Sequence, residues 1–174
     1  MKKFLIVVDM QKDFVDGALG TGEAQAIVPL VCEKIKNFDG EIIVTYDTHT
    51  DDYLNSAEGK KLPVVHCVKS TDGWQLETDV ATAIESKSHM KIEKPTFGSV
   101  ELPILISKLA DGDEFEVELI GLCTDICVVS NALLLKANFP EIKITVDSSC
   151  CAGVTVDSHN AALNTMKMCQ IDVK

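Results

Sequence analysis

Short runs rich in valine and isoleucine alternate along this chain with longer segments whose apolar residues recur at helical spacing. Such alternation predicts βαβ units around a parallel sheet. We expect strands near residues 3–8, 41–46, 89–92, 115–121 and 142–146, with a last short strand at 171–173. We expect helices near residues 23–37, 102–110, 125–138 and 157–169, with Gly112 ending the second and Asp157 capping the fourth. The pattern predicts an α/β fold of three layers, α/β/α, with a mostly parallel, Rossmann-like sheet.

The length and charge of the chain restrict what it can bind. Its 174 residues suffice for one domain, residues 1–174, with a substantial core. The formal net charge of −11 disfavours nucleic acid and anionic membranes as partners, because both require a positive field on the protein. The apolar runs are also too short to cross a bilayer. A small molecule is the expected partner.

The cysteine content indicates a reducing environment. Seven cysteines would suggest disulfides in a small secreted chain, but the number is odd and no signal peptide precedes the first strand. We therefore expect reduced thiols and a cytoplasmic location. No CxxC pair points to a zinc ribbon or a thioredoxin-like site.

The segment Gly121–Val129 has the clearest chemistry of any in the chain. It predicts a buried strand, a turn and the start of a helix, with Cys127 at the helix N-terminus. The backbone N–H groups and positive dipole end of a helix stabilise a thiolate, and they can also hold the oxyanion formed by its attack. Cys127 is therefore the candidate nucleophile. The alternative is that it is a small, buried apolar residue.

Two charged residues stand at the ends of other predicted strands. Asp9 follows the first strand and Lys94 follows the third. Because the carboxyl ends of parallel strands meet at one edge of a sheet, we expect both side chains near Cys127. A lysine there favours the thiolate, and a carboxylate can carry the thiol proton to a leaving group. The three residues together predict an acyl-transfer hydrolase, although Asp9 and Lys94 are each explained equally well as solubilising charges.

The stretch from Thr48 to Asp72 lacks clean periodicity and is long for a connection, which is typical of a functional loop. Within it or directly before it stand four residues whose side chains bind divalent metals, namely Asp47, His49, Glu58 and His66. Imidazole and carboxylate ligands suit zinc, iron or manganese. The alternative is a solvated polar loop with His66 as a hydrogen-bonded core residue. The other two histidines, His89 and His159, have no evident partners and are expected to be structural.

Five motifs occur in order along nearly the whole chain. They are Asp9-Met10-Gln11-x-Asp13-Phe14, Asp47-x-His49, His66-Cys67-Val68, Lys94 ahead of Phe97, and Gly121-Leu122-Cys123-Thr124-Asp125-x-Cys127-Val128. Together they resemble the isochorismatase-like cysteine hydrolases, and within that superfamily they are most similar to the nicotinamidases. The resemblance implies an isochorismatase-like hydrolase domain over residues 1–174.

The resemblance implies that Asp9, Lys94 and Cys127 form a catalytic triad. Cys127 would attack an amide carbonyl, Asp9 would carry the thiol proton to departing ammonia, and water would hydrolyse the thioester. The backbone N–H groups of Cys123 and Cys127 would form the oxyanion hole, next to a cis peptide bond between Leu122 and Cys123.

The resemblance also implies a bound metal and a ring pocket. Asp47, His49, His66 and, as in some members, Glu58 would hold a divalent metal, with zinc expected first and iron or manganese as alternatives. The metal would bind the ring nitrogen of the substrate and orient its amide. The ring pocket would be lined by Phe14 and Phe97, with Trp74 left open as a further wall. Members are often dimers or larger, so a homo-oligomer is compatible with the resemblance.

The leading prediction is a metal-assisted cysteine amidohydrolase that releases ammonia from nicotinamide or a similar small primary amide. One alternative is another amidase of the superfamily that acts on a carbamoyl or ureido compound. Cys127 disfavours a vinyl-ether-cleaving isochorismatase. Alternatives of another class are a non-catalytic, flavodoxin-like protein that binds a small ligand at the same sheet edge, and a catalytically silent interaction subunit, which nothing local supports.

Overall fold

A sheet of six parallel strands runs through the middle of the protein. The computed structural model describes residues 1–174, and its strands have the order β3-β2-β1-β4-β5-β6. The strands are β1 (Lys2–Val8), β2 (Glu41–Asp47), β3 (His89–Lys94), β4 (Phe115–Leu122), β5 (Lys143–Ala152) and β6 (Asp172–Val173). Each strand expected from the sequence is present, so the predicted α/β class and parallel sheet are confirmed.

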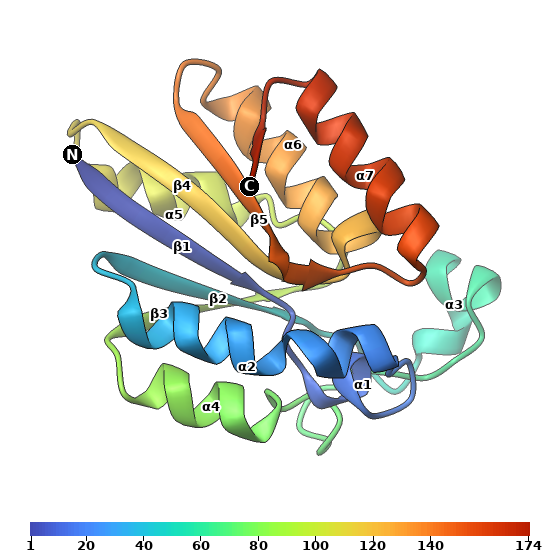
Figure 1. Cartoon of the computed structure of the whole chain (residues 1–174). Coiled ribbons are helices and arrows are strands. Elements are labelled where there is room, and N and C mark those ends of the chain that lie inside the picture. The colour runs from blue at the N-terminus through green and yellow to red at the C-terminus, as the bar shows by residue number, and fades with distance from the viewer.

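Helices cover both faces of the sheet and give it three layers. Helices α2 and α4 lie on one face, and α5, α6 and α7 lie on the other (Figure 1). The helices are α1 (Lys12–Val15), α2 (Gly22–Asn37), α3 (Ala57–Lys61), α4 (Thr78–Glu85), α5 (Glu101–Ala110), α6 (Val129–Asn138) and α7 (Val156–Met168). None of the helices combines the length and the apolar character that crossing a membrane requires.

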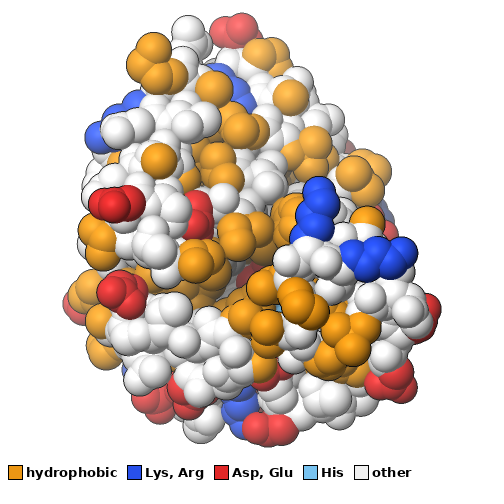
Figure 2. Space-filling view, turned by 90° about the vertical axis from the view of Figure 1, so that its right-hand side faces the viewer, with side chains coloured by type: hydrophobic (Ala, Val, Ile, Leu, Met, Phe, Trp, Pro, Cys, Tyr) orange, Lys and Arg blue, Asp and Glu red, His pale blue; other side chains and the backbone are white.

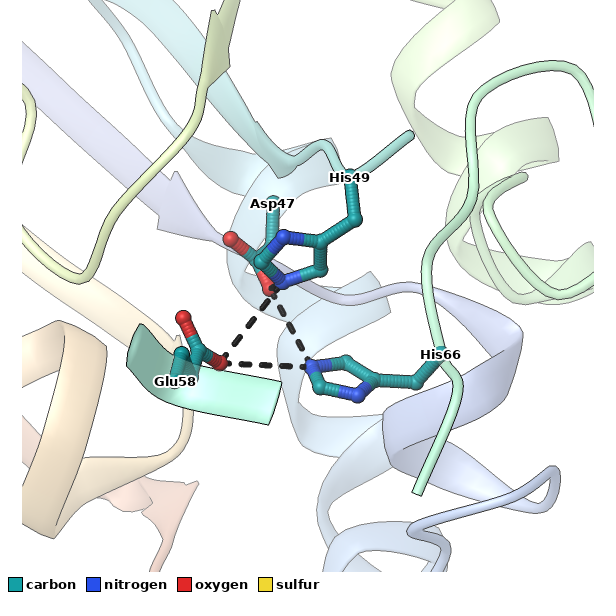
Figure 3. A group of neighbouring side chains, drawn as sticks. All are labelled: Asp47, His49, Glu58 and His66. Carbon is teal, nitrogen blue, oxygen red and sulfur yellow. Dashed lines mark ion pairs between the residues drawn. The ribbon is translucent and has the colours of Figure 1, made fainter. Parts of the chain in front are cut away.

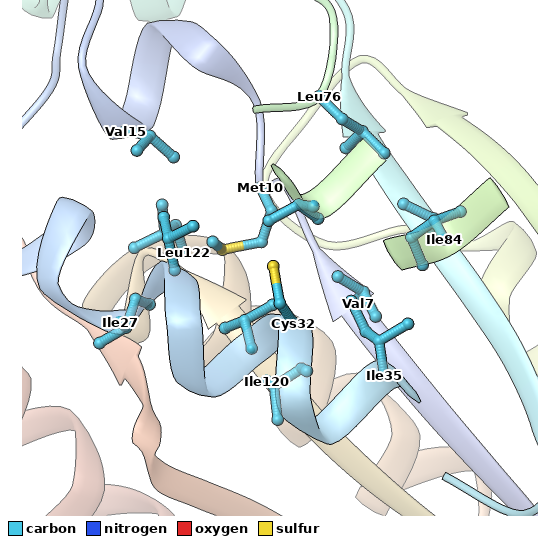
Figure 4. Packing of buried hydrophobic residues seen from close by; sticks show 14 of the residues in the cluster. Val7, Met10, Val15, Ile27, Cys32, Ile35, Leu76, Ile84, Ile120 and Leu122 are labelled. Atoms are coloured by element: carbon cyan, nitrogen blue, oxygen red, sulfur yellow. The ribbon is translucent and has the colours of Figure 1, made fainter. Parts of the chain in front are cut away.

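Two hydrophobic cores flank the central strand, because successive side chains of a strand point to opposite faces. Leu5 and Val7 of β1 pack in the core below α2 and α4. Phe4, Ile6 and Val8 pack in the core below α5, α6 and α7. Figure 4 shows the first of these cores, in which side chains of α2 lie over the strands. Burial on both faces explains why the strands read as continuous apolar runs.

Some elements differ from those expected. Strand β5 continues to Ala152, six residues beyond the predicted end, and α4 was not predicted. The stretch predicted to be an irregular loop contains α3 and a 3₁₀ turn at Tyr53–Asn55. Helix α7 begins earlier than expected and is capped by Thr155, whose Oγ1 accepts the Ser158 N–H at 3.0 Å. Asp157 is therefore a residue of the first helical turn and not the cap.

Strands β1 and β4 come unusually close near their carboxyl ends. Gly121 has a φ of +115°, and a Cβ added there would lie 2.1 Å from the carbonyl oxygen of Val8. Only glycine fits this position, since other residues disfavour positive φ and carry a Cβ. The pairing between β4 and β5 also shifts register between Leu119 and Gly121. These features place the segment after β4 directly beside the residue that follows β1.

Candidate active site and metal centre

Asp9, Lys94 and Cys127 converge at the carboxyl edge of the sheet from three different elements. Asp9 follows β1, Lys94 is the last residue of β3, and Cys127 lies in the π-helical turn Thr124–Val128 between β4 and α6. Lys94 Nζ lies 2.6 Å from Asp9 Oδ2 and 3.4 Å from Cys127 Sγ. All three side chains are buried. The structure thus brings together the three residues that the sequence singled out.

The surroundings of these side chains determine where their protons reside. Burial raises the pKa of Cys127 well above its usual value, Asp9 raises it further, and Lys94 only partly opposes both. Burial likewise raises the pKa of Asp9, against the lowering effect of Lys94. Burial lowers the pKa of Lys94, but Asp9, Cys127 and Asp47 outweigh it, so the net pKa is raised. The resting cluster therefore holds a neutral thiol beside a lysine ammonium.

Thr45 fixes the carboxylate of Asp9. Its Oγ1 donates a hydrogen bond of 2.6 Å to Asp9 Oδ1, and both residues are inaccessible to solvent. The other carboxylate oxygen of Asp9 is the one that faces Lys94. Sequence reasoning missed Thr45, although a threonine inside the apolar run of β2 was a signal that a polar partner lay nearby.

Four potential metal ligands converge beside this cluster. Their donor atoms all lie within 4.8 Å of one another, and Figure 3 shows the side chains turned toward a common centre. Nε2 of His49 lies 3.0 Å from Asp47 Oδ2 and 3.6 Å from Glu58 Oε1. Nε2 of His66 lies 3.5 Å and 3.7 Å from the same two oxygens. Asp47 ends β2, His49 follows it, Glu58 is on α3, and His66 is in the loop after α3.

The residues present fit a divalent cation. Nε2 of His49 is buried without a hydrogen-bond partner in the protein and lies 3.0 Å from Asp47 Oδ2. Buried polar atoms normally have partners, so an orphaned imidazole nitrogen among three other potential ligands indicates a ligand that binds it. Two imidazoles and two carboxylates form a ligand set that suits zinc, iron or manganese. This observation favours the metal interpretation of the loop over the solvated one.

The surrounding residues hold the imidazoles in position. Nδ1 of His66 lies 2.7 Å from the carbonyl oxygen of Val64, which directs Nε2 toward the centre of the group. The ring of Tyr53 packs against both His49 and His66, with centroids 4.6 and 4.9 Å apart. The hydrogen bond from Nδ1 of His66 to the Val64 carbonyl selects the tautomer in which Nε2 of His66 is free to bind a metal.

Gln11 and Asp13, which belong to the first motif, support the metal ligands from behind. The Gln11 side chain is buried, accepts the Asp47 N–H at 2.8 Å and donates to the Asp47 carbonyl at 2.9 Å. Asp13 Oδ2 accepts the N–H of Cys67, the neighbour of His66, at 2.8 Å. The segment that carries Asp9 therefore also fixes the backbone at Asp47, the end of β2, and at Cys67, next to His66.

The thiol and three of the potential metal ligands open into one cavity of about 220 Å³. Three of the ligands, Asp47, Glu58 and His66, line it together with Cys127. Most of the remaining lining is apolar and comes from Phe14, Leu19, Ala24, Leu62, Phe97, Leu122, Ile126 and Val154. Figure 2 shows hydrophobic side chains gathered around a hollow on this side of the molecule. Both phenylalanines expected at the pocket are among the lining residues.

Cys123 also lines this cavity, one turn before Cys127. The peptide bond between Leu122 and Cys123 is cis, as the resemblance implied. The Cys123 carbonyl accepts hydrogen bonds from the N–H groups of Ile126 and Val128, which close the turn around Cys127. Burial, together with the charge of Asp125, raises the pKa of the Cys123 thiol to about 12, so its sulfur is uncharged at neutral pH.

Two further residues take positions that the sequence left open. Trp74 does not line the cavity, because its indole packs against Tyr46 and its Nε1 donates to Thr48 Oγ1 at 2.9 Å. His159, expected to be structural without an evident partner, has Nδ1 2.8 Å from Oγ1 of buried Thr124. The second contact ties α7 to the turn that carries Cys127.

Comparisons with known proteins identify the family of the chain. A model of the isochorismatase domain family matches residues 3–173. The chain is 31% identical over 175 residues to an uncharacterised isochorismatase family protein, PncA of Bacillus subtilis (strain 168), with 94% of this chain and 93% of that protein covered.

Two solved structures extend the likeness to three dimensions. The pyrazinamidase of Pyrococcus horikoshii in complex with zinc has a TM-score of 0.83 at 26% identity, covering 100% of this chain and 99% of that one. The nicotinamidase/pyrazinamidase PncA from Bacillus subtilis has a TM-score of 0.80 at 27% identity, covering 99% of each chain. The family model spans nearly the whole sequence, and the chain therefore belongs to the isochorismatase family of hydrolases.

Proposed function

We propose that the protein is a metal-assisted cysteine amidohydrolase that releases ammonia from nicotinamide or a similar small primary amide. One observation carries the proposal: the buried thiol of Cys127 and three of the four metal-binding side chains line the same small, largely apolar cavity. Its volume of about 220 Å³ suits a single aromatic ring with a carboxamide substituent. The likeness to a nicotinamidase and a pyrazinamidase supports the same substrate class.

In the first step the sulfur of Cys127 attacks the carbonyl carbon and a C–S bond forms. Asp9 takes the thiol proton, which is needed because the thiol is neutral at rest. Its own raised pKa makes Asp9 a stronger base than an exposed carboxylate. The backbone N–H groups of Cys123 and Cys127 hold the oxyanion that develops on the carbonyl oxygen.

In the second step Asp9 delivers the proton to the amide nitrogen, the C–N bond breaks and ammonia leaves. The acyl group remains on Cys127 as a thioester. A water molecule then attacks the same carbon, Asp9 takes a proton from it, and the C–S bond breaks to release the carboxylic acid. Cys127 regains its proton at the end of the cycle. The ammonium of Lys94, 2.6 Å from Asp9 and 3.4 Å from the sulfur, balances the negative charge on either residue throughout.

Asp47, His49, Glu58 and His66 would hold the metal beside the catalytic cluster. A divalent metal there, zinc by analogy with the Pyrococcus horikoshii structure, would supply a ligand position for a ring nitrogen and would so orient the amide toward Cys127. Phe14 and Phe97, which both line the cavity, would flank the ring. The seven unpaired cysteines support a cytoplasmic location for the enzyme.

The test is ammonia release from nicotinamide by the purified protein, measured beside two cysteine variants. Cys127→Ala should abolish release, whereas Cys169→Ala, which changes an exposed cysteine far from the cavity, should retain it. Release that persists in Cys127→Ala would refute the nucleophile. If nicotinamide is not hydrolysed, the same assay with carbamoyl and ureido amides separates another amidase from a protein that only binds its ligand.

A further inference from the structure

Asn131 connects the nucleophile to the wall of the cavity. It lies in the first turn of α6, is inaccessible to solvent, and is neither a member of the proposed triad nor a potential metal ligand. Its Nδ2 donates to the carbonyl oxygen of Cys127 at 2.8 Å and to that of Phe97 at 3.1 Å. Its Oδ1 accepts the N–H of Ser99 at 2.9 Å. Both amide hydrogens and the oxygen are thus used, and a fully satisfied buried network of this kind rigidifies the groups that it joins.

The loop that Asn131 holds is residues 95–100, between β3 and α5. It has a second anchor, because the Lys94 ammonium donates to the carbonyl oxygen of Thr96 at 3.1 Å. Most of the loop is exposed, with the buried Ser99 as an exception. The backbone of Phe97 is therefore fixed by two side chains, of which only Asn131 lies outside the proposed catalytic cluster.

Phe97 stands between two cavities. It lines the enclosed cavity of about 220 Å³ that contains Cys127, and it also lines an outer cavity of about 720 Å³. Glu58, Leu62 and Ile126 are the other residues that the two cavities share. Phe97 is 41% exposed, so few contacts of its own hold it in place. Its position depends on the backbone that Asn131 binds.

Resting on the proposed function, we infer that Asn131 is a positioning residue that limits the size of the amide that reaches Cys127. By fixing the Phe97 loop, it keeps the inner cavity closed on the side of the outer one. A single-ring amide fits the closed cavity, whereas a fused bicyclic amide needs space beyond Phe97. Removing the Asn131 side chain lets the loop move and joins the two cavities. Selection by substrate size is then lost, whereas hydrolysis of the amide continues.

The experiment compares kcat and KM for nicotinamide and quinoline-3-carboxamide, which keeps the ring nitrogen and carboxamide and adds a fused ring. In Asn131→Ala, the ratio of kcat/KM for nicotinamide to kcat/KM for quinoline-3-carboxamide should fall about tenfold or more. The fall should arise mainly because the two KM values become more alike. Phe97→Ala removes the wall itself and should produce the same fall. Asn138→Ala is the matched control, because exposed Asn138 makes an equivalent 2.8 Å bond to Leu134 on the same helix.

A second measurement does not depend on amide turnover. The rate of alkylation of Cys127, followed by mass spectrometry of its peptide, is compared for iodoacetamide and a naphthyl iodoacetamide. The ratio of the bulky to the small rate should rise about tenfold in Asn131→Ala and Phe97→Ala and stay constant in Asn138→Ala. Hydrogen exchange of the loop 95–100 should accelerate in Asn131→Ala alone.

The two proposals fail separately. If the wild-type protein hydrolyses no amide, the proposed function fails, and the alkylation ratio still decides the role of Asn131. A folded Asn131→Ala variant with wild-type size selection in both assays overturns the inference. If Asn131→Ala does not fold, Phe97→Ala with an unchanged alkylation ratio overturns it equally, because the wall would then not be Phe97.

Discussion

The ammonium nitrogen of Lys94 lies 2.6 Å from a carboxylate oxygen of Asp9, and neither side chain is accessible to solvent. Removing one member of a buried ion pair leaves the other charge without a partner, which typically costs about 3–5 kcal/mol. We therefore expect Lys94→Met to lower the free energy of unfolding strongly and to abolish turnover. Adding Asp9→Asn should recover part of the lost stability but no activity. Urea denaturation of the single and double variants checks this, and equal stabilities of the two would contradict it.

Removing one metal ligand should separate metal binding from the thiol chemistry. We expect His49→Ala to reduce the metal content of the purified protein and to raise KM for nicotinamide, because the three remaining ligands, Asp47, Glu58 and His66, bind a divalent cation less tightly than four. Elemental analysis and steady-state kinetics measure both effects. Exposed His89 supplies the control, and His89→Ala should keep its metal. Full metal occupancy in His49→Ala would remove His49 from the ligand set.

Gln11 should influence the metal without touching it. Gln11→Ala breaks both hydrogen bonds to the backbone of Asp47, so we expect metal affinity to fall about 10- to 100-fold, as is usual when a supporting residue is lost. Competition with a chromophoric chelator gives the affinity directly. Gln75→Ala, an exposed glutamine variant, provides the comparison. An unchanged affinity in Gln11→Ala would mean that Asp47 holds its position without this support.

Acid should weaken an ion pair far from the active site. Burial alone would raise the pKa of Asp147, but hydrogen bonds from Lys34 and Ser149 outweigh it and lower the pKa below its usual value. Since the folded-state pKa is below that of the unfolded chain, the pair stabilises the protein above about pH 4 and loses this effect as the pH falls. Asp147→Asn should therefore cost about 1–3 kcal/mol at pH 7 and progressively less below pH 4.

Urea unfolding of the wild type and Asp147→Asn at a series of pH values measures this difference. Asp172→Asn, which changes an exposed aspartate of the neighbouring strand β6, is the control variant. A difference between wild type and Asp147→Asn that stays constant from pH 7 to pH 3 would show that the Lys34–Asp147 contact of 2.7 Å does not act through charge.

The strands and most long helices were predictable because the spacing of their apolar residues matches the faces that they bury in the two cores. Strand β5 was cut short because Asp147, Ser148 and Ser149 read as its end, whereas Asp147 is satisfied there by Lys34 of α2. Helix α4 was missed because eight residues give too short a stripe, with only Val80, Ala83 and Ile84 buried. The end of β5 therefore depends on a partner, Lys34, that is distant in the sequence.

In the candidate site, too, some residues could be found from the sequence and others could not. The chemically distinctive residues, such as Cys127 and His66, stood out by type and spacing. Gln11 and Asn131 did not, because an amide side chain shows its role only when its three or four hydrogen-bond partners are known. Those partners come from segments as far as 63 residues away, as the bond from Gln11 to the Trp74 carbonyl shows. Residues that support a site are therefore harder to find from sequence than those that react.

The packing around Gly121 leaves no space for even one additional carbon atom. A methyl group at this position would collide with the carbonyl oxygen of Val8, the residue immediately before Asp9. The strand that leads to Cys127 would then have to move away from the strand that leads to Asp9. The proton transfer that we propose between Asp9 and Cys127 therefore depends on the absence of a Cβ at position 121.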